Sequence, residues 1–385
     1  MAESADTVLI GTTKGAFLLS NDTGAWGVRG PFCGGWPINH VIGDAATGQF
    51  WAGGGSDWTG AGIWHSSDGE TWRLTKLSNG KFDDWLTAEP EFAAQMNLKP
   101  DPPAPYTGVV ESVWSLQRSD DRLLAGMKPA ALYQSRDEGE SWQRIDGLTE
   151  HPSAPTWEPG GAGLVLHTIV TDRTNPERVW VGISAAGIFA TEDGGATWDR
   201  RNRLSNEGAD HLHAHPGNAA HDHETGHCVH NLVLAPGTTD RLYQQNHHGV
   251  FRSADGGRSW HEISEGLPST FGFPIAVHPN DPDTLWVLPL NGDMAGRFPP
   301  DAAAAVWRSR DGGESWQALR EGLPQTGCYF TVLRQAMATR AGPSIGLAFG
   351  TNSGSVFYSS DEGDSWQEIA RHLPTVLSVE FLQKQ

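Results

Sequence analysis

One eight-residue pattern recurs along the chain and constrains its fold more than any other feature. The pattern reads Ser/Thr-x-Asp-x-Gly-x-Ser/Thr-Trp, and intact copies cover residues 135–142, 191–198, 253–260, 309–316 and 359–366. A copy that is one residue short covers 66–72, and a degenerate copy covers 20–26. The closing Trp residues are spaced by about 57 residues on average, which indicates seven copies of one structural unit.

Each octet suits a tight turn between two strands. Its Asp accepts hydrogen bonds from backbone N–H groups of the turn, its Gly supplies a positive φ, and its Trp begins the next strand. Strand-like segments at 166–170, 179–182 and 187–190 surround one octet, so each unit is predicted to hold four strands with the octet between the third and fourth. Because equivalent turns cannot all be active sites, we assign structural roles to Asp137, Asp193, Asp255, Asp311 and Asp361.

The octets resemble the Asp-box motifs of BNR repeat proteins, a sialidase-like superfamily that also includes xyloglucanases, sortilin-type receptors and photosystem assembly factors. The resemblance extends over nearly the whole chain. Together with the repeat it predicts an all-β fold, a seven-bladed β-propeller of four-stranded antiparallel blades that forms one domain over residues 1–385. The first blade lacks a strand before 7–11, and we expect the C-terminal strand at 375–381 to join this N-terminal blade and close the ring.

The amino-acid composition limits which partners the protein can bind and in which cellular compartment it is expected. The 46 acidic and 27 basic residues give a formal net charge of −19, which argues against nucleic acid as a partner. No run of 18 apolar residues is present, so no membrane-spanning helix is expected. The first residues show no signal-peptide pattern, and three Cys are too few for a disulfide framework. We therefore expect a cytoplasmic protein.

Long irregular segments are predicted on the face opposite the octet turns. They lie near 73–110, with a short helix near 84–96, and near 143–163 and 199–228. Loops of this length in a compact domain are usually functional. The last segment is rich in His from His211 to His223, which we interpret as a flexible surface loop, with His227 close to the site entrance.

An alignment of the innermost strands by their apolar pattern suggests a metal site. It assigns one equivalent height to His40, Glu111, His167 and His230 in blades 2 to 5, and to Phe273 in blade 6. If these side chains point to the axis, three imidazoles and a carboxylate suit a divalent transition metal, Zn, Mn or Fe. Such a metal activates water or polarises a substrate oxygen. The alternative is that each His is a core residue bonded to backbone or water.

The connections between the second and third strands are expected to surround the same mouth. They contribute His247 as a further ligand or general base. They also contribute Lys128 and Arg297, which suit an anionic substrate or a developing oxyanion. With Glu111, these residues form the predicted catalytic set.

Three functions follow as hypotheses. The first is a metal-dependent hydrolase or lyase, with an oxygenase still open, that acts on a small polar or carbohydrate-like substrate. The second is a glycoside hydrolase in which Glu111 works with Asp57 or Asp293. The resemblance does not extend to true sialidases, because their Arg-Ile-Pro segment is absent. The third is a non-catalytic scaffold that binds a protein partner.

Overall fold

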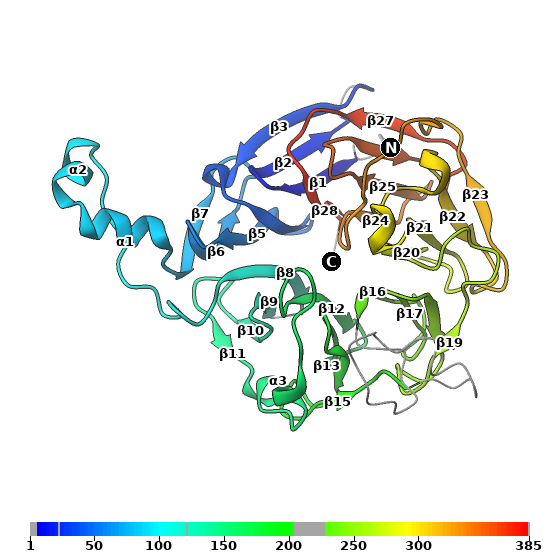
Figure 1. Ribbon diagram of the computed structural model, residues 1–385, viewed down its shortest axis with the longest axis horizontal. Helices are drawn as coiled ribbons and strands as arrows, with labels where there is room; N and C mark the ends of the chain where they lie inside the picture. Colours follow the sequence, from blue (N-terminus) through cyan, green and yellow to red (C-terminus); the bar gives the residue numbers. More distant parts are fainter. Residues whose placement is uncertain (1–5, 22–23, 121, 204–227, 384–385) are drawn as a thin grey trace.

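The computed structural model describes residues 6–21, 24–120, 122–203 and 228–383. These residues form seven four-stranded antiparallel sheets arranged as blades around a common axis (Figure 1). The predicted seven-bladed β-propeller is therefore confirmed. The innermost strand of every blade faces the axis, and the long connections are carried on this framework.

The blades are numbered here in chain order. Blade 1 contains β28 (Val376–Phe381), β1 (Thr7–Thr12), β2 (Gly15–Ser20) and β3 (Gly27–Phe32); blade 2 contains β4 (Ile38–Asp44), β5 (Gln49–Ser56), β6 (Gly60–Ser66) and β7 (Arg73–Ser78); blade 3 contains β8 (Ser112–Ser119), β9 (Arg122–Lys128), β10 (Leu132–Ser135) and β11 (Gln143–Arg144). Blade 4 contains β12 (Leu166–Asp172), β13 (Asn175–Ile183), β14 (Gly187–Thr191) and β15 (Asp199–Arg200); blade 5 contains β16 (Val229–Leu234), β17 (Leu242–Asn246), β18 (Val250–Ser253) and β19 (His261–Glu262). Blade 6 contains β20 (Gly272–Val277), β21 (Leu285–Pro289), β22 (Val306–Ser309) and β23 (Gln317–Leu319); blade 7 contains β24 (Met337–Arg340), β25 (Gly346–Gly350), β26 (Val356–Ser359) and β27 (Gln367–Ala370).

The C-terminal strand closes the ring as predicted. β28 pairs antiparallel with β1, with Val8 opposite Phe381 and Ile10 opposite Val379. Val376 and Val379 are fully buried, so the strand contributes apolar surface to the core as well as hydrogen bonds. Blade 1 is thereby built from both ends of the described chain, and its inner edge is covered.

The five intact octets form the predicted turns, each with the same hydrogen-bond network. In blade 5, Asp255 accepts hydrogen bonds from the Ser253 hydroxyl at 2.8 Å, the Ser259 N–H at 2.9 Å and the Ser259 hydroxyl at 2.6 Å. The Gly257 N–H donates to the Ser253 hydroxyl at 2.8 Å. The four other intact octets repeat these bonds, so the Asp side chains have the structural role predicted for them.

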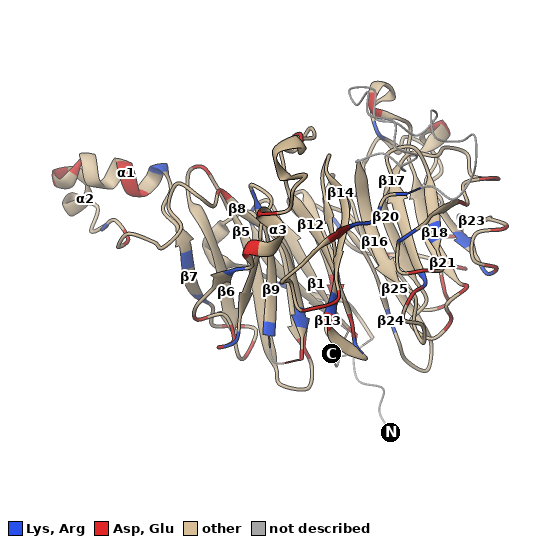
Figure 2. Ribbon diagram, turned by 90° about the horizontal axis from the view of Figure 1, so that it is seen from below, with Lys and Arg blue, Asp and Glu red and all other residues tan. Residues whose placement is uncertain are grey.

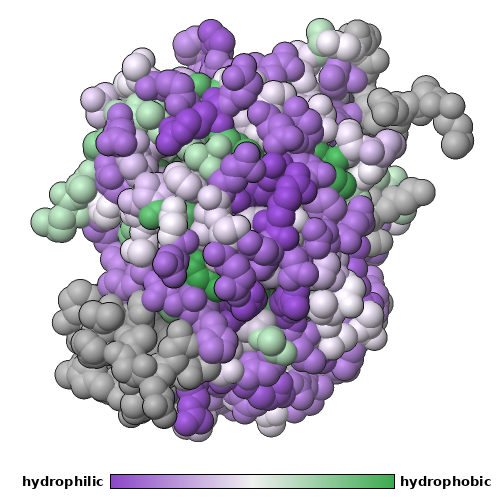
Figure 3. Space-filling view, turned by 90° about the vertical axis from the view of Figure 1, so that its right-hand side faces the viewer, coloured by the Kyte–Doolittle hydropathy of each residue, from purple (hydrophilic) through white to green (hydrophobic). Residues whose placement is uncertain are grey.

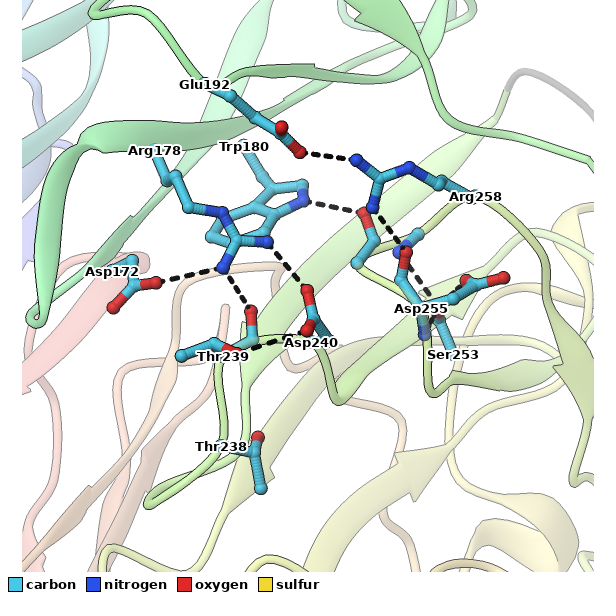
Figure 4. Close-up of polar contacts among 12 residues, drawn as sticks. Asp172, Arg178, Trp180, Glu192, Thr238, Thr239, Asp240, Ser253, Asp255 and Arg258 are labelled. Carbon is cyan, nitrogen blue, oxygen red and sulfur yellow. Dashed lines mark hydrogen bonds and ion pairs between the residues drawn. The ribbon is translucent and has the colours of Figure 1, made fainter.

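Trp side chains connect three of the octets to the preceding blade. The indole N–H of Trp51 donates to Glu138 O, and that of Trp180 donates to Gly256 O, both at 2.9 Å. Figure 4 shows Trp180 beside Arg178, whose guanidinium lies 4.8 Å from its ring. Because the acceptors belong to octets of blades 3 and 5, the turns also hold neighbouring blades in register.

The long connections differ in structure. The segment 73–110 holds α1 (Lys81–Ala88) and α2 (Pro90–Gln95), which extend outward from blade 2 (Figures 1 and 2). The helix expected near 84–96 is thus two short helices. The segment 143–163 holds α3 (Asp146–Thr149), and most of 199–228, including the His-rich stretch, lies outside the described residues.

The described chain also contains four short 3-10 helices, and much of its surface is hydrophilic. The 3-10 helices are η1 (Cys33–Gly35), η2 (Ala154–Thr156), η3 (Asp293–Ala295) and η4 (Pro300–Ala302). The side of the ring in Figure 3 is mostly hydrophilic, with small scattered apolar groups. Within the described ranges, no helix has the length and apolar character needed to cross a membrane.

Candidate functional site

The innermost strands carry a β-bulge at the same position in six blades. In blade 4, Leu166 pairs with Ile183 and Thr168 pairs with Gly182, so His167 between them is extra. In blade 5, the pairs on either side of His230 show the same shift. A bulge leaves one residue unpaired and redirects its side chain. The bulged residues are Leu377, Asn39, Trp114, His167, His230 and, in blade 6, Phe273 beside Pro274.

All six bulged side chains line one cavity of about 420 Å³ at the mouth of the channel. We call it the axial cavity. Blade 7 contributes the segment just before β24, and loops contribute the remaining wall. The other lining residues are Gly160, Gly161, Ala162, Ser184, Cys228, His247, Asp293, Arg297, Leu333, Arg334 and Gln335. The volume is within the range of small-molecule sites, roughly 300–1,000 Å³.

His40 does not reach this cavity, contrary to the predicted alignment. The residue at the bulge of blade 2 is Asn39, and His40 follows it on the opposite side of the strand. The Leu116 N–H donates to His40 Nδ1 at 2.9 Å, so Nε2 carries the proton and donates to Glu380 at 3.2 Å. His40 therefore lines a second cavity, of about 760 Å³, and bridges blade 2 to the closing strand β28.

Glu111 and Lys128 form an ion pair outside the lining of the axial cavity. Lys128 Nζ lies 3.4 Å from Glu111 Oε2, and 60% of the Glu111 side chain is exposed. The equivalent position in blade 3 is Trp114, three residues later. The predicted placement of Glu111 at the axis is therefore wrong, because the position equivalent to the other bulges lies three residues further along β8.

His167 lies in the cavity wall with both ring nitrogens engaged. Its Nε2–H donates to Val229 O at 3.1 Å, and Nδ1 lies 2.8 Å from the Thr168 hydroxyl. Burial, and next the charge of Arg334, hold the pKa of His167 well below its ordinary value of 6.5. The imidazole is therefore neutral and fits the alternative of a hydrogen-bonded core residue.

His230 lines the cavity and uses one ring nitrogen for a hydrogen bond to the main chain. Its Nδ1 lies 2.6 Å from Gly272 O, and because a carbonyl only accepts, the proton is on Nδ1. The lone pair of Nε2 has no partner among the described residues. Burial, followed by the charge of Arg334, holds the pKa of His230 well below 6.5. His230 is thus a neutral imidazole with a defined tautomer at the cavity wall.

His247, Asp293 and Arg297 form a chain of polar contacts beside His230. The rings of His230 and His247 meet edge to face with centroids 5.4 Å apart. His247 Nε2 lies 3.6 Å from Asp293 Oδ2, and Arg297 Nε lies 2.5 Å from Asp293 Oδ1. Asp293 therefore orients an imidazole and a guanidinium at once, and both line the axial cavity as the sequence predicted.

Arg334 adds a second guanidinium, which sequence reasoning missed. It lies 5.1 Å from the ring centroid of Phe273, while Arg297 lies 5.7 Å from the same centroid. Its backbone is held by the Asn231 side chain, whose Nδ2 donates to Arg334 O at 2.6 Å. Burial lowers the pKa of Arg334 to about 10, so it stays charged at neutral pH.

The four predicted metal ligands do not meet at one point. His167 and His230 share the axial cavity, His40 lines the other cavity, and the exposed Glu111 lines neither. Across the ranges that the structure describes, no group of three or more His, Cys, Asp or Glu side chains is arranged to hold a metal ion. The residues in place thus do not fit the metal that was predicted.

A stricter sequence pattern would have found the bulged positions. In blades 1 to 5 the bulged residue follows a buried aliphatic residue and precedes a polar residue and a second aliphatic residue, as in Ile38-Asn39-His40-Val41 and Leu166-His167-Thr168-Ile169. When the innermost strands are aligned on both aliphatic residues, the pattern places Asn39 and Trp114 at the bulges instead of His40 and Glu111. No such signal exists for Arg334, which precedes the innermost strand of blade 7.

The chain is similar in sequence to some known proteins and similar in fold to others. The chain matches no protein-family profile. Over 226 residues it is 23% identical to the oligoxyloglucan-reducing end-specific xyloglucanase of Emericella nidulans, which covers 52% of this chain and 26% of that protein. It is 26% identical to a xyloglucanase of a Paenibacillus species over 230 residues, 53% of this chain and 20% of that protein. The chain thus spans about a quarter or less of these relatives' length.

Solved structures share the fold. An ancestral GH74 enzyme superposes with a TM-score of 0.55 at 14% identity, over 86% of this chain and 38% of its own. YCF48 from Cyanidioschyzon merolae gives 0.53 at 13% identity, covering 86% and 85% of the two chains. Apo AztD from Citrobacter koseri gives 0.55 at 11% identity and covers 98% of both. At these identities the likeness establishes the propeller and not an activity.

Proposed function

We propose that the protein is a hydrolase that acts on a small, carbohydrate-derived substrate in the axial cavity. The observation that carries the proposal is His230, a neutral imidazole whose tautomer is set by Gly272 and whose Nε2 is available at the cavity wall. The partial similarity to xyloglucanases supports a carbohydrate-derived substrate. The cavity volume of about 420 Å³ suits a ligand of one or two sugar units.

The side chains supply the parts of a hydrolytic step. His230 Nε2 takes a proton from water, and the resulting hydroxide attacks the substrate carbon. Arg297, oriented by Asp293, stabilises negative charge that develops on the substrate oxygen. The imidazolium then returns its proton to the leaving oxygen as the bond to it breaks. Asp293 also orients His247, a second acid or base beside the first.

The number of carboxylates in the described lining of the axial cavity indicates which type of substrate bond is cleaved. Standard glycoside hydrolysis uses two carboxyl groups that flank the bond. Asp293 is the only carboxylate among the described lining residues, whereas imidazole and guanidinium groups are abundant. This set suits cleavage of an acyl–oxygen bond, as in a sugar ester or lactone. Glycosidic cleavage is the second candidate, favoured by the xyloglucanase similarity. The metal-dependent version has less support, since its ligands lie apart.

A substrate panel with paired variants tests the proposal. The panel contains sugar lactones, acylated sugars, aryl glycosides and xyloglucan oligosaccharides. We expect hydrolysis by the wild type and a loss of kcat of about 10²–10⁴-fold in His230→Gln, with a smaller loss in Asp293→Asn. Because the pKa of His230 is lowered, activity should persist from neutral pH to below pH 6.5. His65→Gln, on β6 away from the cavity, is the control.

Two outcomes would contradict the proposal. One is that none of the four substrate classes is hydrolysed by the wild type. The other is hydrolysis that His230→Gln leaves unchanged. Metal analysis of untagged protein separates the metal-dependent version, which requires a stoichiometric ion that is lost in His230→Gln.

A further inference from the structure

Buried arginines in this chain generally have a built-in partner. Arg178 lies between Asp172 at 3.1 Å and Asp240 at 2.7 Å (Figure 4). Arg201 pairs with Asp199 at 3.1 Å and Glu192 at 3.4 Å, and Arg308 pairs with Asp364 at 2.9 Å; Arg122 donates to main-chain carbonyls, Pro176 O among them at 2.7 Å. This is the usual solution for a charge removed from water, because an unpaired one is costly.

Arg334 departs from this pattern. Its side chain is only partly exposed, and no hydrogen bond or ion pair joins its guanidinium to any described residue. Its Nε is buried without a partner, as are those of Arg201 and Arg308, but their terminal nitrogens are paired with carboxylates. The contact that it does make is with the face of Phe273 at 5.1 Å. A buried polar group left unsatisfied in a cavity wall requires an explanation, and functional sites are where such groups are concentrated.

The surrounding charges leave a net positive centre. Asp293 is the one carboxylate of the described lining, and Arg297 already occupies it at 2.5 Å. His167 and His230 are neutral, since burial and the charge of Arg334 both disfavour their protonation. Among the described lining residues, the charge of Arg334 is therefore uncompensated, in a chain whose formal net charge is −19.

We infer that the Arg334 guanidinium binds an anionic group, a carboxylate or a phosphate, of the ligand that enters the axial cavity. The ligand class is thus a sugar acid or a sugar phosphate, an inference that rests on the proposed function. A planar guanidinium suits both groups because it donates two parallel hydrogen bonds to paired oxygens. Arg297, near the other guanidinium on Phe273, adds positive charge to the same side of the cavity.

Calorimetric titration with four probes tests this inference. The probes are gluconate, glucose 6-phosphate, glucose and inorganic phosphate, each at low and at physiological salt. We expect one or both charged sugars to bind with a clear preference over glucose, and the preferred one distinguishes carboxylate from phosphate. Binding should weaken with salt, as electrostatic attraction predicts. Equal binding of glucose and the charged sugars would overturn the inference, as would binding of none of the four.

Three variants separate the roles of this side chain. Arg334→Gln should weaken binding of the charged sugar roughly tenfold to a hundredfold, and Arg334→Lys should recover part of it. Arg310→Gln removes an exposed positive charge that pairs with Glu362, and it should leave affinity unchanged. Without ligand, Arg334→Gln should melt at or above the wild-type Tm, because it removes a largely desolvated charge that has no ion-pair partner among the described residues. A Tm several degrees lower would indicate a structural role and would overturn the inference.

The binding and hydrolysis experiments together distinguish a failure of the anion site from a failure of the proposed hydrolase. Charged sugars that bind through Arg334 without being hydrolysed would support the anion site and contradict the hydrolase. Hydrolysis of charged substrates with the same kcat/KM in wild type and Arg334→Gln would support the hydrolase and contradict the anion site.

Discussion

At the scale of the residue, two buried imidazoles couple the candidate site to pH. His167 and His230 are each hydrogen-bonded to a main-chain carbonyl through one nitrogen, and both are almost fully buried. The pKa of each is lowered well below 6.5, first by burial and then by the charge of Arg334. The folded protein therefore resists proton uptake that the unfolded chain accepts.

This difference predicts an acid-sensitive fold. Below about pH 6.5 the unfolded chain binds more protons than the folded one, so the free energy of unfolding falls as the pH drops. Each of the two His contributes up to about 1.4 kcal/mol per pH unit. Urea titrations between pH 7.5 and 5 measure the slope. His167→Gln should lower it by about one proton, whereas the exposed His372→Gln is the control. An unchanged slope in His167→Gln would refute this account.

At the scale of the element, local hydrogen bonds shape the octet turns, whereas cross-strand pairing shapes the bulges. In blade 5 the bonds of Asp255 join residues two and four positions apart, so the turn forms from its own sequence. The bulge at His230 depends instead on how β16 pairs with β17. Turns therefore stabilise the ring, and bulges direct side chains into the axial cavity.

The structural role of the octets leads to a second prediction. Asp255→Ala removes three hydrogen bonds to a carboxylate and leaves turn donors unsatisfied, so we expect a loss of about 1–3 kcal/mol in the free energy of unfolding. Ligand affinity should not change, because the turn is not part of the cavity lining. Denaturant unfolding measures the loss, with the exposed Glu265→Ala as the control. Loss of affinity with unchanged stability would instead assign the Asp a functional role.

At the scale of the whole molecule, the ring depends on contacts between distant parts of the chain. β28 completes blade 1 beside β1, and Gln335 forms a bridge with Ser378 between blades 7 and 1. The side chain of Gln335 also donates to His167 O across the axis. Closure therefore holds the walls of the axial cavity in place as well as protecting a sheet edge.

Removing the closing strand should open the ring. A chain that ends at Leu373 exposes the inner edge of β1 and loses the buried side chains of Val376 and Val379. We expect a strongly lowered Tm and concentration-dependent association in size-exclusion chromatography. A synthetic peptide of residues 374–385 should restore a monomeric profile by adding the missing strand. A truncated chain that melts and elutes like the full chain would contradict this role.

The sequence by itself determined the repeat, the number of blades and the closing strand, because octet bonds are local and the apolar pattern of strands repeats with every unit. It also identified His167, His230, His247 and Arg297 as residues of the mouth. The tertiary structure alone decided the rest. A bulge shifts the strand by one residue in blade 2, so Asn39 lines the cavity where His40 was expected. In blade 3 the bulge is at Trp114, three residues after the expected Glu111, because strand pairing and not the apolar pattern alone sets its position. That Arg334 has no ion-pair partner among the described residues likewise depends on which groups other blades bring near it, and the order of residues in the chain does not encode those distances directly.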